Sequence, residues 1–318
     1  MRWGLIARSE RDRGLGIQTK AMYDNLHPDK TLVVVNKRSG FESHPEDYPD
    51  ATVAEFRNEH GRWKFANEEI VRDWISGLDV VVSVETLYDW DLFGDVKTIV
   101  HGNPEFWLPT NTQPDVWWWP TPWRSEHLPR GPVVPVPVPD VPIIAAEPGG
   151  LLRATHVAGS GAMEDRNGSN IVRMAMRKTV NVDIEIYDQS SAPVTDRWDM
   201  YRDRHVLVMP RRYGGLCLPV LEALASGLMV VMSECSPNST WPAVLVPGDQ
   251  GKVVKMQTGP VTLFNTHHNR LAATLNHLAK HPETVALHQR RALEWAQENT
   301  WPALAGRYHD EISHAHSV

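Results

Sequence analysis

The sequence has little cysteine, no excess of positive charge and no long apolar run, and each shortage excludes a class of protein. Two cysteines among 318 residues exclude a disulfide-stapled fold and favour a reducing cytosol. A formal net charge of −7 excludes a uniformly basic nucleic-acid coat. The longest apolar stretch, 216–233, is interrupted by Pro219, Glu222 and Gly227, so we expect no membrane span. Residues 1–14 lack the apolar core of a signal peptide, so we expect a cytoplasmic protein.

The composition that is present is that of an ordinary globular protein. Apolar residues make up 42% and charged residues 22% of the chain. A chain of 318 residues is about twice an average domain, which predicts two domains.

Short apolar segments alternate with helical patterns along the whole chain. An apolar strand at 3–7, a glycine loop, a helical pattern at 17–27 and a strand at 31–35 begin a βαβ unit. A second such series starts at 152–158, after the segment 120–142, whose alternating prolines favour an extended, stiff connection. The predicted fold class is α/β, with two doubly wound Rossmann-like domains that bind ligands in a cleft between them.

The expected domain boundaries follow from this alternation of strand and helix patterns, which starts a second time near residue 152. We place one domain at 1–130, a second at 131–300, and a C-terminal helix at 301–318 that packs back on the first domain. The helical tail is expected to break at Pro302. Trp residues 117–119 are predicted to form a strand that alternates between two faces, and core packing is favoured over stacking on a base or sugar.

Residues 209–227 carry the most informative pattern. A strand ends, a glycine loop exposes backbone N–H groups, and a helix begins at Pro219, which suits the first helical turn. Such loops and helix N-termini bind anions. Glu222 lies one turn into the helix, where its carboxylate can accept both hydroxyls of a ribose, and Arg211 and Arg212 lie on the approach. On spacing alone, an ordinary βα turn with an N-terminal glutamate is an equal alternative.

This segment resembles the signature of retaining glycosyltransferases with the GT-B fold, in the GT4-like group. That signature is a glutamate, Gly-Phe-Gly-Leu-Pro, a second glutamate at i+8, then Ala, Ala and Gly. The residues in register are Gly215, Leu216, Leu218, Pro219, Glu222, Ala223, Ala225 and Gly227. The resemblance implies that Glu222 holds the donor ribose and that the amides of Gly214, Gly215 and Leu216 hold the donor sugar and phosphate. Gly214 replaces the first glutamate, which in the family contacts the transferred sugar, and compact phage-encoded enzymes look similar.

A second glycine motif follows the first strand of the second domain. GT4-like enzymes carry there an arginine and a lysine that neutralise the donor diphosphate, and Ser160 and Asn167 stand at those positions. We expect Gly159 and Ser160 to bind the donor. Arg166, with Arg211 or Arg212, is expected to stabilise the leaving diphosphate. An exposed loop arginine is the alternative.

The glycines of Arg13-Gly14-Leu15-Gly16 precede the first helix. The motif resembles the loop of GT-B enzymes where acceptor and donor phosphate meet, so Gly14 and Gly16 are candidate donor-binding residues. A dinucleotide site needs a third glycine at Thr19, which disfavours a nicotinamide-dependent oxidoreductase.

Candidate acceptor-binding residues follow the strands of the first domain. They are Arg13, Lys37, Arg38, Glu85 and His101. With Arg8 and Arg11 they place five cations after the first two strands, in a segment (1–140) that holds 15 Lys and Arg against 22 Asp and Glu. Focused positive charge favours an anionic acceptor. The histidine pairs near 267 and 314 lack companions at ligand spacing, so no metal is expected.

The implied reaction moves a sugar, with retention, from a nucleoside diphosphate sugar to an acceptor hydroxyl, with no bound cofactor. UDP-glucose is the donor guessed, and DNA with a 5-hydroxymethylated pyrimidine, flipped from the helix, is one acceptor. A phage-encoded enzyme of this kind would act in the host cytoplasm. A cell-envelope glycan or a small molecule is an alternative acceptor, and a non-catalytic nucleotide-sugar-binding protein is an alternative of another class.

Overall fold

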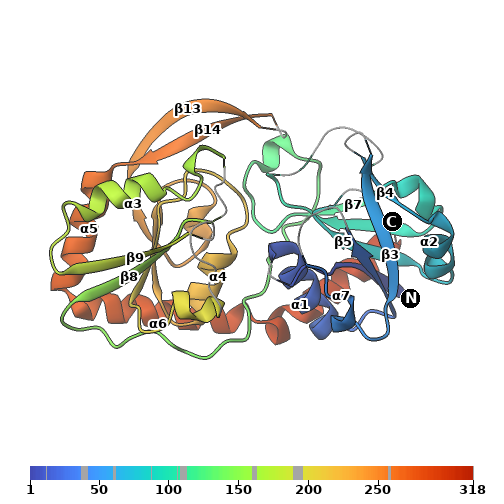
Figure 1. The fold of residues 1–318 in the computed structure, drawn as a ribbon, viewed down its shortest axis with the longest axis horizontal. Coiled ribbons are helices and arrows are strands. Elements are labelled where there is room, and N and C mark those ends of the chain that lie inside the picture. The colour runs from blue at the N-terminus through green and yellow to red at the C-terminus, as the bar shows by residue number, and fades with distance from the viewer. Residues whose placement is uncertain are drawn as a thin grey trace. The chain divides into compact units, whose positions relative to one another are not determined.

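The chain folds into two compact units, each with its own sheet (Figure 1). The computed structural model describes residues 1–11, 13–36, 42–59, 62–86, 88–105, 107, 113–159, 163–188, 196–256 and 259–317. Unit 1 comprises Met1–Pro120, Arg124–Pro135 and Trp301–Val318, and unit 2 comprises Thr121–Trp123 and Val136–Thr300. The predicted α/β class with parallel sheets is confirmed.

Unit 1 is built on a seven-stranded sheet of order β4-β3-β2-β1-β5-β6-β7. Its strands are β1 (Trp3–Arg8), β2 (Lys30–Val35), β3 (Thr52–Glu59), β4 (Arg62–Phe65), β5 (Val80–Val84), β6 (Lys97–His101) and β7 (Val116–Trp118). Its helices are α1 (Gly14–Leu26), α2 (Glu68–Ile75) and α7 (Trp301–Ser317). All neighbouring strands pair in parallel except β3 and β4.

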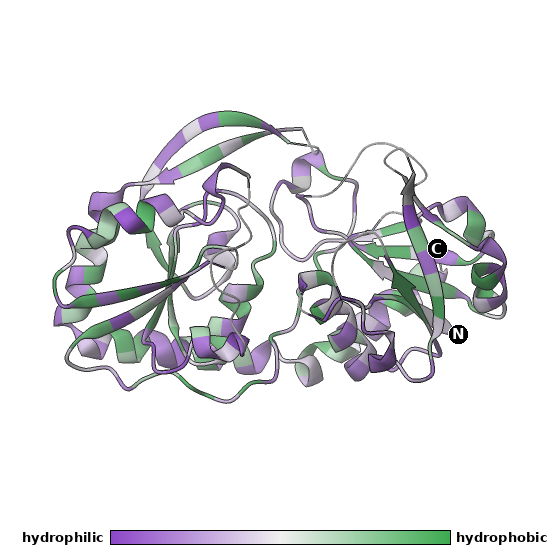
Figure 2. Ribbon diagram, in the orientation of Figure 1, coloured by the Kyte–Doolittle hydropathy of each residue, from purple (hydrophilic) through white to green (hydrophobic). Residues whose placement is uncertain are grey.

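Helices cover both faces of this sheet, which explains its continuous apolar strands. Met22 of α1 and Tyr308 of α7 pack with Leu5 on one face, whereas Trp74 of α2 packs with Ile6 on the other. Figure 2 shows the hydrophobic strands inside and hydrophilic residues on the outer helical surfaces.

The three consecutive tryptophans are core residues. Trp117 and Trp119 stack with their ring centroids 4.9 Å apart on one face of the sheet, and Trp118 points into the opposite core cluster. All three are at most 5% exposed. The expected alternation is confirmed, and the burial leaves no ring face for stacking on a base or sugar.

Unit 2 is built on a parallel five-stranded sheet of order β12-β11-β10-β8-β9. Its strands are β8 (Leu152–Val157), β9 (Val182–Tyr187), β10 (Val206–Met209), β11 (Met229–Ser233) and β12 (Val244–Val246). Its helices are α3 (Ser169–Met176), α4 (Leu218–Ala225), α5 (His268–Lys280) and α6 (Pro282–Glu298). Helices α3 and α5 cover one face of the sheet, and α4 and α6 cover the other.

A separate antiparallel hairpin, β13 (Gly248–Met256) with β14 (Gly259–Thr266), follows β12 (Figure 1). The sequence predicts short strands near Val244 and Val253 but not this hairpin, nor the β3–β4 pair. These strands carry many charged and polar residues, because one side of each pair faces solvent, and so they lack the apolar run of a buried parallel strand.

One further expectation needs correction. The spacing of residues 196–202 predicts a helix, but this segment forms only a 3₁₀ turn at Arg197–Met200. The helical tail is interrupted at Asn299 and Thr300, next to Pro302 as expected, and also before Pro282. Pro302 itself lies in the first turn of α7, where proline is tolerated. In the proline-rich segment, Val134, Val136 and Val138 are buried against the protein.

In the part of the chain that the structure describes, the helices are either too short or too polar to cross a bilayer.

Candidate active site

The loops after β8 and β10 meet because these strands are parallel neighbours. The Arg212 amide donates a hydrogen bond to the Arg166 carbonyl oxygen over 2.8 Å. Gly168, at φ 79°, fits against the Pro210 carbonyl oxygen, which would lie 2.3 Å from an added Cβ. The structure therefore brings together the loops that carry Arg166, Arg211 and Arg212, as the sequence predicts.

Arg212 is held by neutral oxygen atoms. Its Nη1 donates to the Glu164 carbonyl oxygen and its Nη2 donates to the Asn265 side-chain oxygen over 2.7 Å. The Glu164 carboxylate instead pairs with Lys252 over 2.7 Å. Carbonyl and carboxamide oxygens orient a guanidinium group without cancelling its charge. Arg212 is therefore fixed as a cation at this edge of the sheet.

Arg211 differs, since it is only 2% exposed. It lies near the Cys235 thiol: burial raises the pKa of Cys235 to about 11, and the charge of Arg211 acts in the opposite direction. Solvent barely reaches the Arg211 side chain in this structure. Of the two arginines, the half-buried Arg212 suits the diphosphate role better.

The loop before α4 keeps the geometry that an anion site requires. Gly214 adopts φ 120°, a conformation that favours glycine. Gly214 and Gly215 are buried, and Leu216 is partly exposed. Cys217 precedes α4 and supplies no side-chain cap among the described residues, but its carbonyl oxygen accepts hydrogen bonds from the amides of Val220 and Leu221 over 3.0 and 3.4 Å. Pro219 has no N–H, so any backbone donors for an anion come from the Gly214–Leu216 loop and Leu218 and not from the rest of the first helical turn.

The N-terminus of α3 is already occupied by a carboxylate. Asp165 accepts hydrogen bonds from the amides of Ser169 and Asn170 over 2.8 and 3.0 Å. Asn167, at the family's lysine position, donates to the carbonyl oxygens of Val157 and Ala158. This loop therefore offers Arg166 as its candidate ligand group and uses Asn167 to hold its own backbone.

Glu222 lies on α4 and is 7% exposed. Its Oε2 accepts a hydrogen bond from the Tyr201 hydroxyl over 2.6 Å, and its Oε1 lies 3.7 Å from Nη1 of Arg197. The sequence pattern found Glu222 but missed Tyr201 and Arg197. Nothing local marks those two residues, because only the fold brings the turn at Arg197–Met200 beside α4.

Gly159 adopts φ 78°, which favours glycine, with the Asn167 side chain close above it. Ser160, the other donor-binding candidate in this loop, lies outside the described residues.

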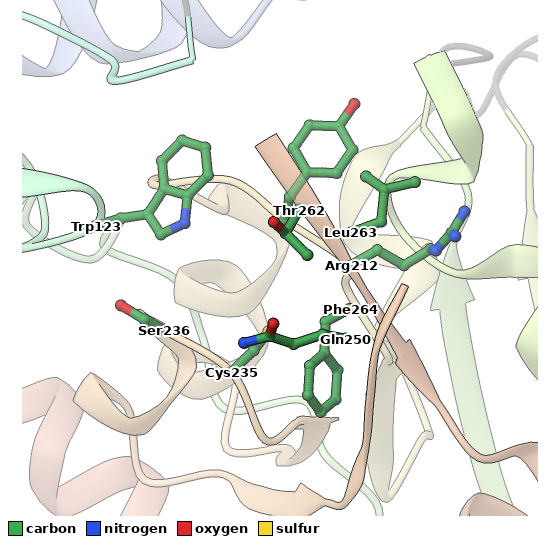
Figure 3. A pocket seen from close by; sticks show the side chains of 9 residues that line it. Trp123, Arg212, Cys235, Ser236, Gln250, Thr262, Leu263 and Phe264 are labelled. Carbon is green, nitrogen blue, oxygen red and sulfur yellow. The ribbon is translucent and has the colours of Figure 1, made fainter. Parts of the chain in front are cut away.

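The hairpin borders a small pocket of about 120 Å³ (Figure 3). Its lining includes Trp123, Tyr213, Gln250 and Thr262. The Arg212 guanidinium points away from the Trp123 side of this pocket. The pocket therefore lies behind the Arg212 side chain and not at its charged end.

In unit 1, the two glycines expected in a loop before the helix lie in the first turn of α1. Gly14 begins α1, with Arg13 as the preceding cap residue, and Gly16 is the third residue of the helix. An added Cβ at Gly16 would lie 2.0 Å from the Glu10 carbonyl oxygen, so position 16 has no room for a side chain. The expected glycine loop is therefore the start of the helix, packed against the segment that follows β1.

The expected rim of five cations is not what the described residues form. Arg8 pairs with Glu10 over 2.6 Å, and both side chains are largely buried. Arg11 pairs with Asp47, also over 2.6 Å. Lys37 and Arg38 lie outside the described residues. Two of the five positive charges are thus balanced by carboxylates, which weakens the electrostatic case for an anionic acceptor.

His101 is a core residue, contrary to the expected acceptor contact. It is 1% exposed, and its Nε2 donates to the Val134 carbonyl oxygen over 2.9 Å. Burial lowers the pKa of His101 to about 4, against the opposing effect of that bond. The ring therefore serves as a neutral packing group.

Glu85 remains a candidate for the acceptor. It follows β5 in the left-handed region at φ 55°, which is uncommon for a residue with a side chain and often marks a functional position. The pKa of Arg8 is lowered by burial but raised overall, first by its hydrogen bond to Glu10 and to a smaller extent by the charge of Glu85.

Among the described residues, no group of three or more His, Cys, Asp or Glu is placed to hold a metal ion.

Comparison with known families assigns the second half of the chain. Residues 140–273 match the family model described as "Glycosyl transferases group 1". This segment is therefore similar to group 1 glycosyltransferase domains. It contains both arginine loops, Glu222 and the hairpin, and it confirms the predicted enzyme class of glycosyltransferase. No protein of curated function matches the sequence.

Solved structures extend the likeness over the whole chain at the level of fold. A sucrose-phosphate synthase from Thermosynechococcus elongatus is 12% identical with a TM-score of 0.64, and the match covers 99% of this chain and 100% of that one. The lipopolysaccharide outer core galactosyltransferase WaaB is 11% identical with a TM-score of 0.59, over 98% and 99% of the two chains. The group 1 domain and these neighbours confirm the GT-B fold class.

A third neighbour is the pneumococcal O-GlcNAc transferase GtfA in complex with UDP and GlcNAc, 12% identical with a TM-score of 0.53. The match covers 84% of this chain and 66% of GtfA, so the chain spans just under two thirds of that protein's length.

Proposed function

We propose that the protein transfers a sugar from a nucleoside diphosphate sugar to an acceptor hydroxyl, with retention at the anomeric carbon. The observation that carries this proposal is the edge of unit 2, where Glu222, the Gly214–Leu216 loop and Arg212 lie within the glycosyltransferase group 1 domain. A carboxylate, a glycine loop before a helix and an oriented cation are the groups needed for ribose and diphosphate.

In this reaction the bond between the anomeric carbon and the diphosphate oxygen breaks, and a bond to the acceptor oxygen forms on the same face. The acceptor proton passes to the leaving diphosphate. Negative charge therefore grows on the diphosphate in the transition state, where Arg166, Arg212 and the backbone of the Gly214–Leu216 loop would stabilise it. Glu222 would bind the ribose equally in both states.

The donor we propose to test first is UDP-glucose. UDP is present in the GtfA neighbour, and the neighbour WaaB is a galactosyltransferase. Gly214 at the family's glutamate position leaves the transferred sugar open, so UDP-GlcNAc, UDP-galactose and GDP-mannose belong in the same panel.

The acceptor we propose is DNA with a 5-hydroxymethylated pyrimidine, and the competing acceptors are a cell-envelope glycan and a small molecule. Because Arg8 and Arg11 pair with carboxylates, fewer positive charges are available to attract DNA. Among the described residues, Arg13 and Glu85 remain the candidates for acceptor binding.

The test is a transfer assay read by mass spectrometry. Each donor is incubated with duplex DNA containing 5-hydroxymethylcytosine, with unmodified DNA as the control. A gain of one hexose on the modified DNA alone supports donor, acceptor and class together, and the anomeric proton coupling of the product reports retention.

Other outcomes separate the alternatives. Release of nucleoside diphosphate without a DNA product supports the enzyme and rejects the DNA acceptor. Donor binding without any turnover across the panel supports the non-catalytic nucleotide-sugar-binding protein instead.

A further inference from the structure

Tyr201 and Glu222 form a buried pair that the family signature does not contain. Tyr201 follows the 3₁₀ turn Arg197–Met200 and is fully buried. Its hydroxyl donates to Glu222 Oε2 over 2.6 Å, a short bond of the kind that a phenol makes to a carboxylate. Both residues belong to unit 2, and the core cluster under α4 holds the Tyr201 ring in place.

The two carboxylate oxygens of Glu222 have different surroundings. Oε2 is taken by Tyr201. Oε1 accepts no hydrogen bond from the described residues and lies 3.7 Å from Nη1 of Arg197, beyond hydrogen-bonding distance. The Arg197 side chain is 36% exposed and its guanidinium lies over the Trp198 ring. One oxygen is therefore fixed by the protein, and the other is left toward the exposed arginine.

We propose that Tyr201 is a positioning residue that locks the Glu222 carboxylate and so sets the preference for ribonucleotides over 2′-deoxyribonucleotides. The proposal rests on the proposed function, in which Glu222 binds the donor ribose. A carboxylate that cannot rotate holds its other oxygen, Oε1, in one fixed position. When a deoxyribose binds, this charged oxygen loses the hydrogen bond that a ribose 2′-hydroxyl would donate. A carboxylate freed by loss of the phenol can turn toward the remaining hydroxyl or toward water.

The phenol keeps its proton under all ordinary assay conditions. Burial, and then the negative charge of Glu222, raise the pKa of Tyr201 well above its usual value of 10. Tyr201 therefore acts as a donor to the carboxylate, and the pair does not exchange roles as pH changes.

Tyr201→Phe is the decisive variant, since it keeps the ring that packs the core and removes only the hydroxyl. The matched control is Tyr187→Phe. Tyr187 packs against the same core cluster, and its hydroxyl donates to the Asp199 carbonyl oxygen of the Arg197–Met200 turn and not to Glu222, so it tests loss of a nearby phenol hydroxyl alone. Thermal unfolding of each variant checks that the fold is kept.

The experiment measures dissociation constants by calorimetry for UDP, GDP, ADP and CDP and for their 2′-deoxy counterparts. For the nucleotide that binds best, the wild type and Tyr187→Phe are expected to favour the ribose form by about 30-fold. Tyr201→Phe is expected to lower that ratio about 10-fold. A residue that only packs the core would weaken both nucleotides together and leave the ratio unchanged.

Two contrary results are distinct. An unchanged ratio in Tyr201→Phe, with clear ribose preference in the wild type, overturns the positioning role and leaves the proposed function standing. Failure of the wild type to bind any of the nucleoside diphosphates overturns the proposed function, and the positioning role falls with it.

Discussion

In unit 1 the arginines after the first strand are paired with carboxylates, whereas in unit 2 Arg212 is held by a backbone carbonyl and a carboxamide. Arg8 is joined to Glu10 and Arg11 to Asp47. Arg212 donates to Glu164 and Asn265 oxygens that carry no net charge. Arginines at the carboxyl ends of β1 in unit 1 and of β10 in unit 2 thus have different kinds of partner. Paired charges stabilise the loop, and a charge held by neutral partners remains able to bind an anion.

The largest effect is expected from breaking the buried pair in unit 1. Glu10→Ala leaves Arg8 buried without its carboxylate and is expected to lower the free energy of unfolding by about 3 kcal/mol. Asp47→Ala breaks the more exposed pair with Arg11 and is expected to cost about 0.5 kcal/mol. Urea unfolding of both variants measures the difference. Equal costs would mean that burial does not distinguish the two pairs.

The second effect concerns the carboxylate of unit 2. Glu222→Ala is expected to weaken nucleoside diphosphate binding about 100-fold, or about 2.7 kcal/mol, because two hydrogen bonds to a charged acceptor are lost. Calorimetric titration measures the change, and Glu294→Ala on the exposed surface of α6 is the control. Unchanged affinity in Glu222→Ala would remove the ribose assignment.

A third variant makes unit 2 resemble unit 1. Asn265→Asp keeps an oxygen acceptor for Arg212 but adds a negative charge, so turnover is expected to fall about 10-fold while the fold is retained. Asn269→Asp is the matched control, because Asn269 accepts from Lys178 on the surface of α5. Steady-state kinetics with the best donor decide the point, and wild-type turnover in Asn265→Asp would show that the charge of Arg212 is not used.

The smallest effect is the one that the two units share. Burial lowers the pKa of His101 in unit 1 and of His156 in unit 2 to about 4, while backbone carbonyl bonds oppose the shift. The unfolded chain therefore binds more protons than the folded chain between about pH 6.5 and 4. The contribution of each buried neutral histidine to the free energy of unfolding is therefore complete above about pH 6.5 and is lost as the pH is lowered toward 4. At pH 6 the expected loss is about 1 kcal/mol per histidine.

Urea unfolding at pH 7.5 and pH 6 measures this loss. His101→Gln and His156→Gln are each expected to show a smaller difference between the two pH values than the wild type. If the change in free energy of unfolding between the two pH values is the same in both variants as in the wild type, the two rings are not the source of the pH dependence.

The sequence predicted the site residues that are close to one another in the chain. The glycine loop, Pro219 and Glu222 are such neighbours, so their spacing alone places them at the carboxyl edge of the sheet in unit 2. The buried strands of both sheets were predictable for a similar reason, since each is a continuous apolar run.

The partners of those residues could not be read in the same way. Tyr201 and Asn265 are distant in sequence from the groups that they contact, and neither lies in a pattern that marks it. Arg8 and Arg11 looked like free cations because their carboxylates, Glu10 and Asp47, become partners only through loop geometry. His101 looked like a ligand group because its burial depends on Tyr308 of a helix near the other end of the chain.

The most direct test of the account is nucleoside diphosphate release from the sugar donor panel, followed over time for the wild type and Glu222→Ala. We expect steady release from one donor with the wild type and a large loss of that release in Glu222→Ala. Equal release by the two proteins would contradict the assignment of donor binding to the edge of unit 2.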